Sequence, residues 1–290
     1  MQDNYYCRQC LTDWQQGGIN IETLRRAEMN LELDGKRVLI TAASRGLGRA
    51  AALALAAEGA SLAVAGRNIA AMGDLLEELR AAGAAKAVAV HIDLSDRDTL
   101  AKGVAEAAKE LGGIDVFLGN TGGPDSGPFV DVPRAAWEEA LGDSLLPLVD
   151  LTHAVLPHMQ KNGWGRIMYV TTVGVKMVQP NMVLSDSIRL AIVGMAKSLS
   201  IEVAHEGITV NCLCPGPFKT DRMEYLVTSS MERDNIDRAA AEALWLDEVP
   251  AGQFGDPADF GAMVALLSSK RGSFITGQAI ALDGGKSRAY

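Results

Sequence analysis

Short runs of aliphatic residues alternate along this chain with longer segments of helical periodicity, and this alternation constrains the fold more than any other feature. The runs carry few polar residues between their apolar ones, so both faces of the corresponding strands should be buried. Buried strands separated by helices predict an α/β fold, a doubly wound parallel sheet of about seven strands with helices on both faces. The predicted strands are residues 38–40, 62–64, 87–91, 115–118, 167–170, 208–213 and 279–282. The predicted helices are residues 47–58, 69–82, 97–111, 137–161, 188–205 and 260–268, and Pro147 should bend or break the fourth of them.

The 290 residues are enough for one large domain, and no linker rich in Pro, Gly or Ser divides them. Residues 1–29 are polar and weakly periodic, so we interpret them as an N-terminal extension. This extension is either flexible or packed as an arm on a neighbouring subunit. Residues 30–290 should form a single Rossmann domain.

The composition excludes several classes of function. Acidic residues outnumber basic residues by 36 to 27, and the formal net charge is −9, so no nucleic-acid partner is expected. No apolar run approaches the roughly 20 residues that span a bilayer, so no membrane partner is expected either. Residues 1–28 contain Asp3, Asp13 and Glu22 and lack the pattern of a secretory leader, which predicts a cytoplasmic protein.

The chain has four cysteines: Cys7, Cys10, Cys212 and Cys214. The first two have the spacing of metal ligands, but a zinc site needs two more ligands. The other two lie in, or directly after, a strand that is predicted to be buried. We expect four ordinary thiols in a reducing compartment and no metal.

The first predicted strand leads into residues 41–49, Thr-Ala-Ala-Ser-Arg-Gly-Leu-Gly-Arg, which precede a helix rich in alanine. Because Gly46 and Gly48 lack side chains, backbone N–H groups at the start of this helix can approach a pyrophosphate. A Gly-x-Gly alone is weak evidence, since a tight turn without any ligand has the same residues. Its place between a first strand and a helix indicates a dinucleotide site.

This segment resembles the Thr-Gly-x-x-x-Gly-x-Gly motif of the short-chain dehydrogenase/reductase family, with Ala42 replacing the first glycine. The methyl group is small, so the loop should keep its form. Further segments resemble family motifs in the same order over residues 31–285: Asp93-Leu94 beside the adenine, residues 119–122, residues 211–220 beside the nicotinamide and residues 283–285. The resemblance implies a nicotinamide cofactor held by Thr41, Ser44, Arg45, Gly46, Leu47, Gly48, Arg67, Asp93, Leu94, Asn120, Gly122, Arg189, Pro215, Gly216 and Thr220.

The end of the second predicted strand bears on the choice of cofactor. An NAD site usually has an acidic residue there, which binds the ribose 2′-hydroxyl. Residues 65–68 instead read Ala-Gly-Arg-Asn, and no acid occurs between residues 59 and 73. Arg67, together with Arg45, can bind a 2′-phosphate, unless both are merely solvated surface arginines. We expect NADP(H), with NAD(H) as the alternative.

The catalytic positions depart from the family's pattern. The family uses a Tyr as general acid and base, a Lys that lowers the Tyr pKa and binds the ribose, a Ser that polarises the carbonyl and an Asn that supports a proton relay. The residues here are, in that order, Ser185, Arg189, Thr172 and Ser144. Thr172 keeps a hydroxyl, and Arg189 keeps a charge that can hold the ribose. A serine hydroxyl is a far weaker acid than a phenol, however, and arginine cannot shuttle a proton.

Other residues are candidates for the missing proton donor. Lys176 follows Thr172 by four positions, Asp186 follows Ser185, and Tyr225 lies in a predicted substrate lid, residues 218–247. Each also has an ordinary role: a solvated lysine, an N-cap and a packed lid residue. The apolar residues of the lid either line a pocket or hold a helix pair together, opposite a rim at residues 122–129. They are Met223, Tyr225, Leu226, Met231, Leu244 and Trp245.

Three functions remain. The first is an NADP(H)-dependent oxidoreductase acting on a small carbonyl or alcohol. The second is a dinucleotide-binding protein without redox activity, and the third is a lyase or isomerase that reuses the pocket. We favour the first, because the glycine loop and Arg67 indicate retained cofactor binding. The resemblance also implies a homo-oligomer, a tetramer, whose subunits pair through helix 188–205, unless the apolar stripe of that helix faces its own sheet. The stripe comprises Ile192, Met195, Leu199 and Val203.

Overall fold

The computed structural model describes residues 30–289. The chain divides into two units, Met1–Leu31 and Glu32–Tyr290, and the second unit holds all the elements below. The predicted extension at residues 1–29, with Cys7 and Cys10, lies outside the described residues. Within the described part of the chain, no helix is both long enough and apolar enough to cross a membrane.

Seven parallel strands form one sheet in the order β3-β2-β1-β4-β5-β6-β7, which confirms the predicted fold class. The chain builds the sheet outward from β1 to β3, returns to place β4 on the other side of β1, and continues to β7. The order therefore reverses between β1 and β4, the point where doubly wound sheets bind ligands. The strands are β1 (Arg37–Ile40), β2 (Ser61–Gly66), β3 (Lys86–His91), β4 (Val116–Gly119), β5 (Gly165–Val170), β6 (Ile208–Pro215) and β7 (Ala279–Leu282).

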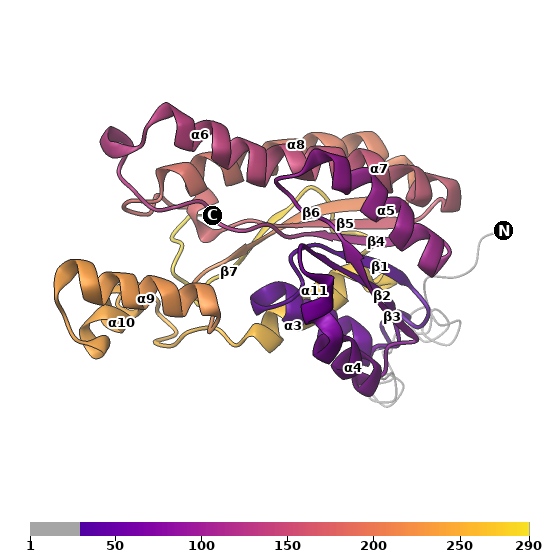
Figure 1. Ribbon diagram of the computed structural model, residues 1–290, viewed down its shortest axis with the longest axis horizontal. Helices are drawn as coiled ribbons and strands as arrows, with labels where there is room; N and C mark the ends of the chain where they lie inside the picture. Colours follow the sequence, from indigo (N-terminus) through magenta and orange to yellow (C-terminus); the bar gives the residue numbers. More distant parts are fainter. Residues whose placement is uncertain (1–29, 290) are drawn as a thin grey trace, which may run out of the picture. The chain divides into compact units, whose positions relative to one another are not determined.

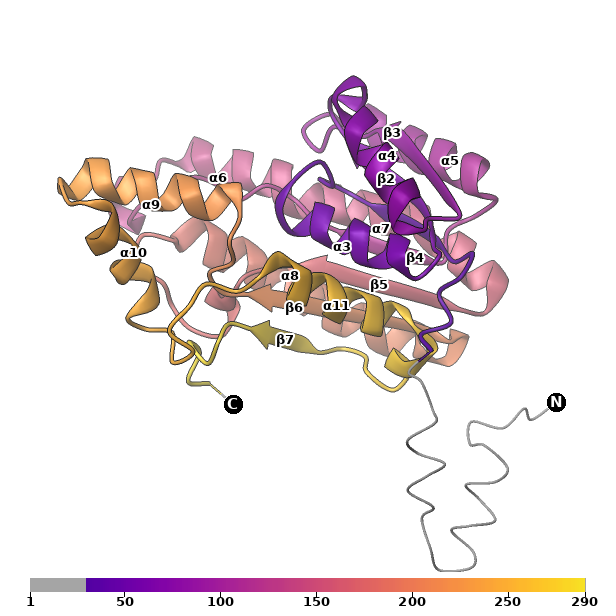
Figure 2. The ribbon, with the colours of Figure 1, turned by 90° about the horizontal axis from the view of Figure 1, so that it is seen from below.

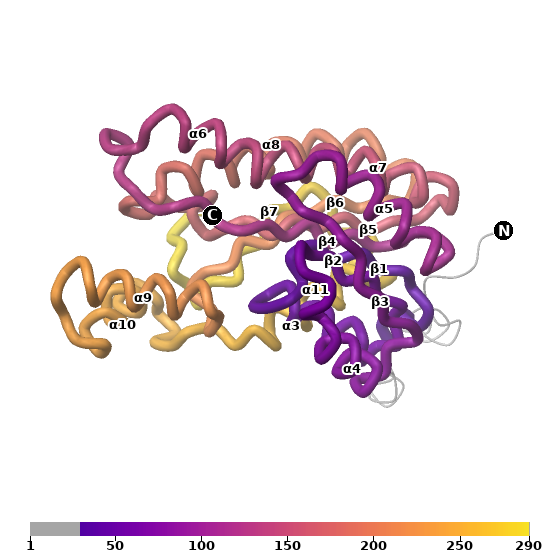
Figure 3. The backbone as a smooth tube through the Cα atoms, viewed as in Figure 1, coloured from indigo at the N-terminus to yellow at the C-terminus, as the bar shows by residue number. Residues whose placement is uncertain are grey.

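Helices cover both faces of the sheet (Figure 1). On one face lie α5 (Arg97–Leu111), α7 (Leu146–Asn162) and α8 (Val183–Val203). On the other lie α3 (Gly46–Ala57), α4 (Gly73–Ala82) and α11 (Pro257–Ser268), with α3 and α11 side by side (Figure 3). Two further helices, α9 (Asp221–Asp234) and α10 (Arg238–Leu246), lie beyond the end of the sheet toward which β5, β6 and β7 point (Figure 2).

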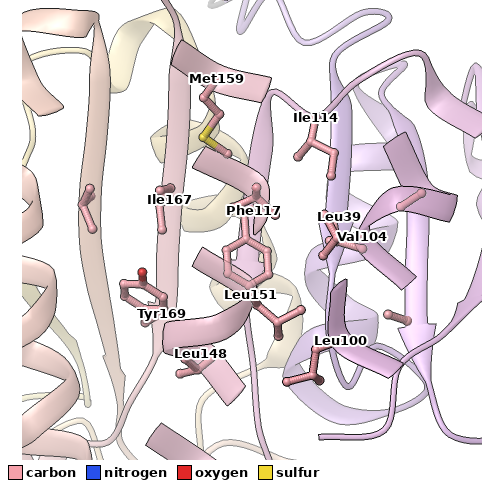
Figure 4. Packing of buried hydrophobic residues seen from close by; sticks show 14 of the residues in the cluster. Leu39, Leu100, Val104, Ile114, Phe117, Leu148, Leu151, Met159, Ile167 and Tyr169 are labelled. Carbon is pink, nitrogen blue, oxygen red and sulfur yellow. The ribbon is translucent and has the colours of Figure 1, made fainter. Parts of the chain in front are cut away.

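The main core lies between the sheet and the layer formed by α5, α7 and α8 (Figure 4). Phe117 in β4 meets Tyr169 in β5 edge to face, with ring centroids 6.4 Å apart. The Tyr169 hydroxyl is buried but shares a hydrogen bond of 2.7 Å with the hydroxyl of Thr152 in α7. Burial raises the pKa of Tyr169, so this phenol is a structural group and not an acid for catalysis.

The predicted helices at 137–161 and 188–205 differ most from the structure, and the one at 69–82 is a 3₁₀ turn (Ile69–Met72) followed by α4. The segment predicted as one helix at 137–161 is α6 (Arg134–Ala140), a π-helical turn (Leu141–Leu145) and α7. Pro147 was predicted to bend or break this helix, and the π-helical turn ends two residues before it in one continuous helical run. Helix α8 begins at Val183, five residues before the prediction, and takes the polar residues 185–187 into its first turns. Asp186 is therefore inside the helix, and its predicted role as N-cap was wrong.

The apolar stripe of α8 packs inside its own chain. Ile192 and Val203 are buried in the main core, and Met195 and Leu199 pack against it. The prediction that this stripe joins subunits was therefore wrong about Ile192 and Val203, whereas Met195 and Leu199 are only partly buried. Other apolar residues of α8, Leu190 and Ile201, are exposed.

The loop after β1 contains a strained residue. Ala42 has a φ of 47°, in the left-handed region, where a Cβ costs about 1–2 kcal/mol. Glycine avoids this cost but loses more conformational freedom on folding, which offsets up to about 1 kcal/mol.

We expect Ala42→Gly to raise the free energy of unfolding by about 0.5–1 kcal/mol, measured by urea titration. Ala43→Gly is the matched control, because Ala43 is buried and its φ is not positive. That control should lower the free energy of unfolding. A loss of stability in Ala42→Gly would contradict the assignment of strain to this residue.

Candidate active site

The predicted site residues gather where the parallel strands end, beside the reversal between β1 and β4. Thr41 and Asn120, which follow these two strands, are hydrogen-bonded to each other. The Thr41 hydroxyl donates to the backbone carbonyl of Asn120 at 2.7 Å and accepts from the backbone N–H of Asn120 at 2.8 Å. The Asn120 side chain also donates to the Ala42 carbonyl at 3.3 Å. These bonds tie the glycine loop to the segment after β4.

The glycine loop fits the pyrophosphate of a dinucleotide. A Cβ on Gly48 would lie 2.6 Å from the Ala42 carbonyl oxygen and 2.9 Å from the Asn120 amide nitrogen, so only glycine fits there. Arg45 occupies the N-cap position of α3 but makes no hydrogen bond from its side chain to the helix. The first N–H groups of α3 are thus open to an anion. Thr220 lies across from Gly46, 3.7 Å from the position a Cβ would take there.

Arg67 directly follows β2, and Asp93 and Leu94 follow the neighbouring strand β3. Arg67 is exposed directly after β2, and its carbonyl oxygen is 3.1 Å from Nδ1 of His91. The pKa of Asp93 lies below its usual value, mainly because the Ser95 hydroxyl and backbone donate to it, and Arg67 contributes. Arg45 and Ser44 are also exposed, but the charged partner of Arg45 is Asp221 of α9, 4.0 Å away.

Arg189 is buried and joins the ends of β4 and β5. Its guanidinium donates to the Thr121 hydroxyl at 2.7 Å and to the carbonyl oxygens of Gly122 at 2.8 Å, Val170 at 3.1 Å and Thr121 at 3.4 Å. Burial lowers the pKa of Arg189 to about 10, and the charge of Arg222 adds to the effect. The group remains a cation at neutral pH. The guanidinium thus donates four hydrogen bonds within the chain. The sequence alone did not indicate these bonds.

Thr172 follows β5 and caps a short 3₁₀ turn, Val173–Val175. Its hydroxyl oxygen accepts from the Gly174 backbone N–H at 3.3 Å and from the Gln179 side-chain amide at 3.4 Å. Gln179 in turn donates its backbone N–H to a carboxylate oxygen of Asp186 at 3.1 Å. No sequence motif marks Gln179, and its role is visible only once the loop is folded.

Ser185 and Ser144 lie on two elements that pack together. Ser185 is half-buried in the first turn of α8. Ser144 is buried in the π-helical turn, which contacts α8. Turns of this type are rare and are often found at functional sites. The place of Ser144 in such a turn is consistent with the predicted alignment of this residue with a catalytic position.

The two other candidate proton donors differ in location. Lys176 is half-buried at the end of the 3₁₀ turn, and its charge acts on the Cys214 thiol at the end of β6. Tyr225 is exposed on α9 beneath the Arg222 guanidinium, 5.3 Å from the ring centre. Burial raises the pKa of the Cys214 thiol, which accepts a hydrogen bond from Thr171, and Cys212 is likewise a buried free thiol.

The predicted lid consists of α9 and α10, which pack mainly on each other. Met223, Val227 and Ala241 form their buried contact, whereas Tyr225 and Leu244 are exposed. Arg222 links this helix pair to the predicted rim by donating to the Pro124 carbonyl at 3.2 Å. Pro215 and Gly216, at the end of β6, are held beside β7 by a bond from the Gly216 N–H to the Leu282 carbonyl at 2.8 Å.

The chain is similar to known proteins over nearly its whole length. A family model described as Enoyl-(Acyl carrier protein) reductase matches residues 41–287. Dehydrogenase/reductase SDR family member 4 of Sus scrofa is 30% identical over 285 residues, which cover 96% of this chain and 95% of that protein. The crystal structure of YwfH, an NADPH-dependent reductase involved in bacilysin biosynthesis, is 28% identical with a TM-score of 0.82, over 88% of this chain and 100% of that one.

A second solved structure is 7α-hydroxysteroid dehydrogenase complexed with NADH and 7-oxo glycochenodeoxycholic acid. It is 28% identical with a TM-score of 0.79, over 88% of this chain and 96% of that one. The family match begins at the glycine loop and includes the strand ends that Asn120 and Arg189 hold together. The chain therefore belongs to the short-chain dehydrogenase/reductase family and is an oxidoreductase of this type.

Proposed function

We propose that this protein is an NADP(H)-dependent oxidoreductase that acts on a small carbonyl or alcohol with a non-standard set of catalytic residues. The observation that carries the cofactor choice is Arg67, an exposed guanidinium at the end of β2, where NAD enzymes usually have an acid. A planar guanidinium can bind a 2′-phosphate through two hydrogen bonds. One relative is described as NADPH-dependent and another was solved with NADH, so the choice between the two cofactors rests on the residues of this chain.

The cofactor, when bound, supplies or accepts the hydride. The open N–H groups of α3, with Thr220, would hold its pyrophosphate, and Asp93 and Leu94 would border the adenine. Gly122 lies at the nicotinamide end, with Pro215 and Gly216 at the end of the neighbouring strand β6. Arg45 can add to the phosphate site by leaving its exposed ion pair with Asp221.

The residues at the chemical step have unequal roles in this proposal. Thr172 donates a hydrogen bond to the carbonyl oxygen, and the fixed charge of Arg189 favours negative charge developing there. Ser185 orients the substrate, and the buried Ser144 lies in the π-helical turn that packs against α8. Arg189 does not move a proton, so the proton comes from water or another group, with half-buried Lys176 one candidate.

A second function is favoured by one specific observation. The hydrogen bonds of Arg189 all go to oxygens of its own chain, and Ser185 replaces the usual acid. A protein that binds the dinucleotide without redox chemistry, as a sensor or an inactive partner, would need no more than this. Turnover of a carbonyl by the wild type decides between the two functions.

We also propose a cytoplasmic homotetramer. The support is exposed apolar surface on the helix layer, since Leu146 of α7 and Leu190 of α8 are both about half exposed. Burying such side chains between subunits is favourable.

The experiment on the cofactor compares the affinities of NADPH and NADH by fluorescence titration. Loss of a charge-assisted phosphate contact costs about 1.5–3 kcal/mol, so Arg67→Ala should weaken NADPH binding roughly 10- to 100-fold and leave NADH binding unchanged. Arg97→Ala is the control, because Arg97 is an exposed arginine whose partner is Asp150. Equal affinities of the wild type for both cofactors would overturn the choice of NADP(H).

Arg189 should stabilise the fold as well as the cofactor site. Arg189→Ala leaves four oxygens at the ends of β4 and β5 without their donor, which should lower the free energy of unfolding by about 3 kcal/mol or more. Arg189→Lys keeps a charge with fewer donors, so its free energy of unfolding should lie between those of the wild type and Arg189→Ala. NADPH affinity should fall in the same order, because Gly122 loses its support. Two variants as stable as the wild type in urea would contradict this role.

Ser185 should contribute little to proton transfer. A general acid contributes on the order of 10²–10⁴-fold, so Ser185→Ala should lower kcat by less than about 100-fold. Ser185→Tyr combined with Arg189→Lys restores the residue types of the family and gives the converse test. If only this double variant reduces carbonyls, the natural protein is a binding protein. A loss of a thousandfold in Ser185→Ala would show that Ser185 itself acts as the acid.

A further inference from the structure

The Thr172 hydroxyl has a defined direction. A hydroxyl has one proton to donate and two lone pairs that accept. Both acceptor positions of Thr172 are used, by the Gly174 backbone N–H and the Gln179 side-chain amide. Its proton is thus directed away from both donors and is left for a ligand. A threonine without these two neighbours could equally well turn its proton toward a backbone carbonyl.

The orientation of the Gln179 amide decides this arrangement. If its oxygen faced Thr172, the hydroxyl would donate to Gln179 and would not be free for substrate. Asp186 sets the orientation, because one carboxylate oxygen accepts from the Gln179 backbone and the other lies beside the Gln179 amide nitrogen, above Gly174. An amide oxygen turned toward that carboxylate would be repelled. The amide nitrogen therefore faces both Asp186 and Thr172.

Gly174 makes room for this arrangement. A Cβ at this position would overlap the Oδ1 atom of Asp186 and would lie 3.1 Å from the Gln179 amide nitrogen. That Oδ1 atom is buried and has no hydrogen-bond partner among residues 30–289. Burial raises the pKa of the carboxyl, and the bonds from Gln179 oppose this effect. A buried oxygen of this kind is costly unless a nearby donor, here the Gln179 amide, compensates for it.

We propose that Gln179 is a positioning residue that aims the Thr172 hydroxyl at the carbonyl oxygen of the substrate, and that Asp186 fixes the orientation of the Gln179 amide. The inference rests on the proposed function, because it takes Thr172 as the donor to the carbonyl. Gln179 does not touch the reacting atoms. It acts by keeping the proton of Thr172 on the side of the substrate.

Steady-state kinetics test the coupling of Gln179 to Thr172. The substrate is whichever ketone or aldehyde of a panel the wild type reduces fastest with NADPH. One hydrogen bond is removed in Gln179→Ala, so kcat should fall roughly 3- to 10-fold while the NADPH dissociation constant stays unchanged. Thr172→Val should lose more activity, and the double variant should be no slower than Thr172→Val. A double variant slower by the product of the two single effects would overturn the proposal.

Asp186→Asn is the sharper variant. The introduced amide keeps an oxygen for the Gln179 backbone but presents an NH₂ group to the Gln179 side chain. Gln179 should then flip, so that its oxygen faces Thr172 and accepts the hydroxyl proton. We expect kcat to fall at least as far as in Gln179→Ala. Ser187→Ala is the control, since Ser187 is exposed on the same helix turn and should retain wild-type kcat.

A measurement without turnover separates this inference from the proposed function. In protein labelled with ¹⁵N-glutamine, the side-chain signal of Gln179 is identified by its loss in Gln179→Ala. It should move in Thr172→Val and Asp186→Asn and stay in place in Ser187→Ala. A signal that does not move in Thr172→Val overturns the inference. If it moves but Thr172→Val keeps full activity, the contact exists but Thr172 is not the donor to the carbonyl, and both the inference and that part of the proposed function fail.

Discussion

The pairing of Thr41 with Asn120 is the contact on which the site depends. It joins the ends of β1 and β4, the two neighbouring strands between which the sheet order reverses. Separating them would leave a hydroxyl and a backbone N–H without partners, at a cost of about 1–3 kcal/mol for each buried group. The glycine loop and the segment from Asn120 to Gly122 therefore stay together, and the open N–H groups of α3 keep a fixed place relative to the end of β4.

Arg189 extends this tie from β4 to β5. A buried cation usually has a carboxylate partner, but this guanidinium is bound by carbonyl oxygens and one hydroxyl at the ends of the two strands. Arginine has five donors in a planar fork, whereas lysine has three around one nitrogen, so arginine reaches more of these oxygens at once. In the proposed alignment, arginine stands at position 189 in place of the family's lysine, which adds a structural contact and removes a group that can release a proton.

Much of this could be predicted from the sequence, for physical reasons that differ by element. The unbroken aliphatic runs predicted the parallel sheet, because strands buried on both faces need such runs. The start of α8 could not be predicted, since the polar residues 185–187 suit either a loop or a first helical turn, and packing against the π-helical turn decides. Gln179 lies in a loop without periodicity and Arg222 in the first turn of α9, and their partners, Thr172 and Pro124, are fixed only by tertiary structure.

The residue replacements inferred for the proposed site share one consequence. A tyrosine and lysine pair gives a family member groups that exchange protons, whereas a serine hydroxyl is a far weaker acid than a phenol and the Arg189 guanidinium stays charged at neutral pH. What remains at the strand ends is polar but fixed: a guanidinium bound by its own backbone and a Thr172 hydroxyl whose lone pairs are occupied. Preorganised groups of this kind can stabilise charge that develops on a bound oxygen without any proton transfer. In the proposed reaction, the fixed Arg189 and Thr172 groups therefore stabilise negative charge on the carbonyl oxygen. The proton comes from water or a separate group.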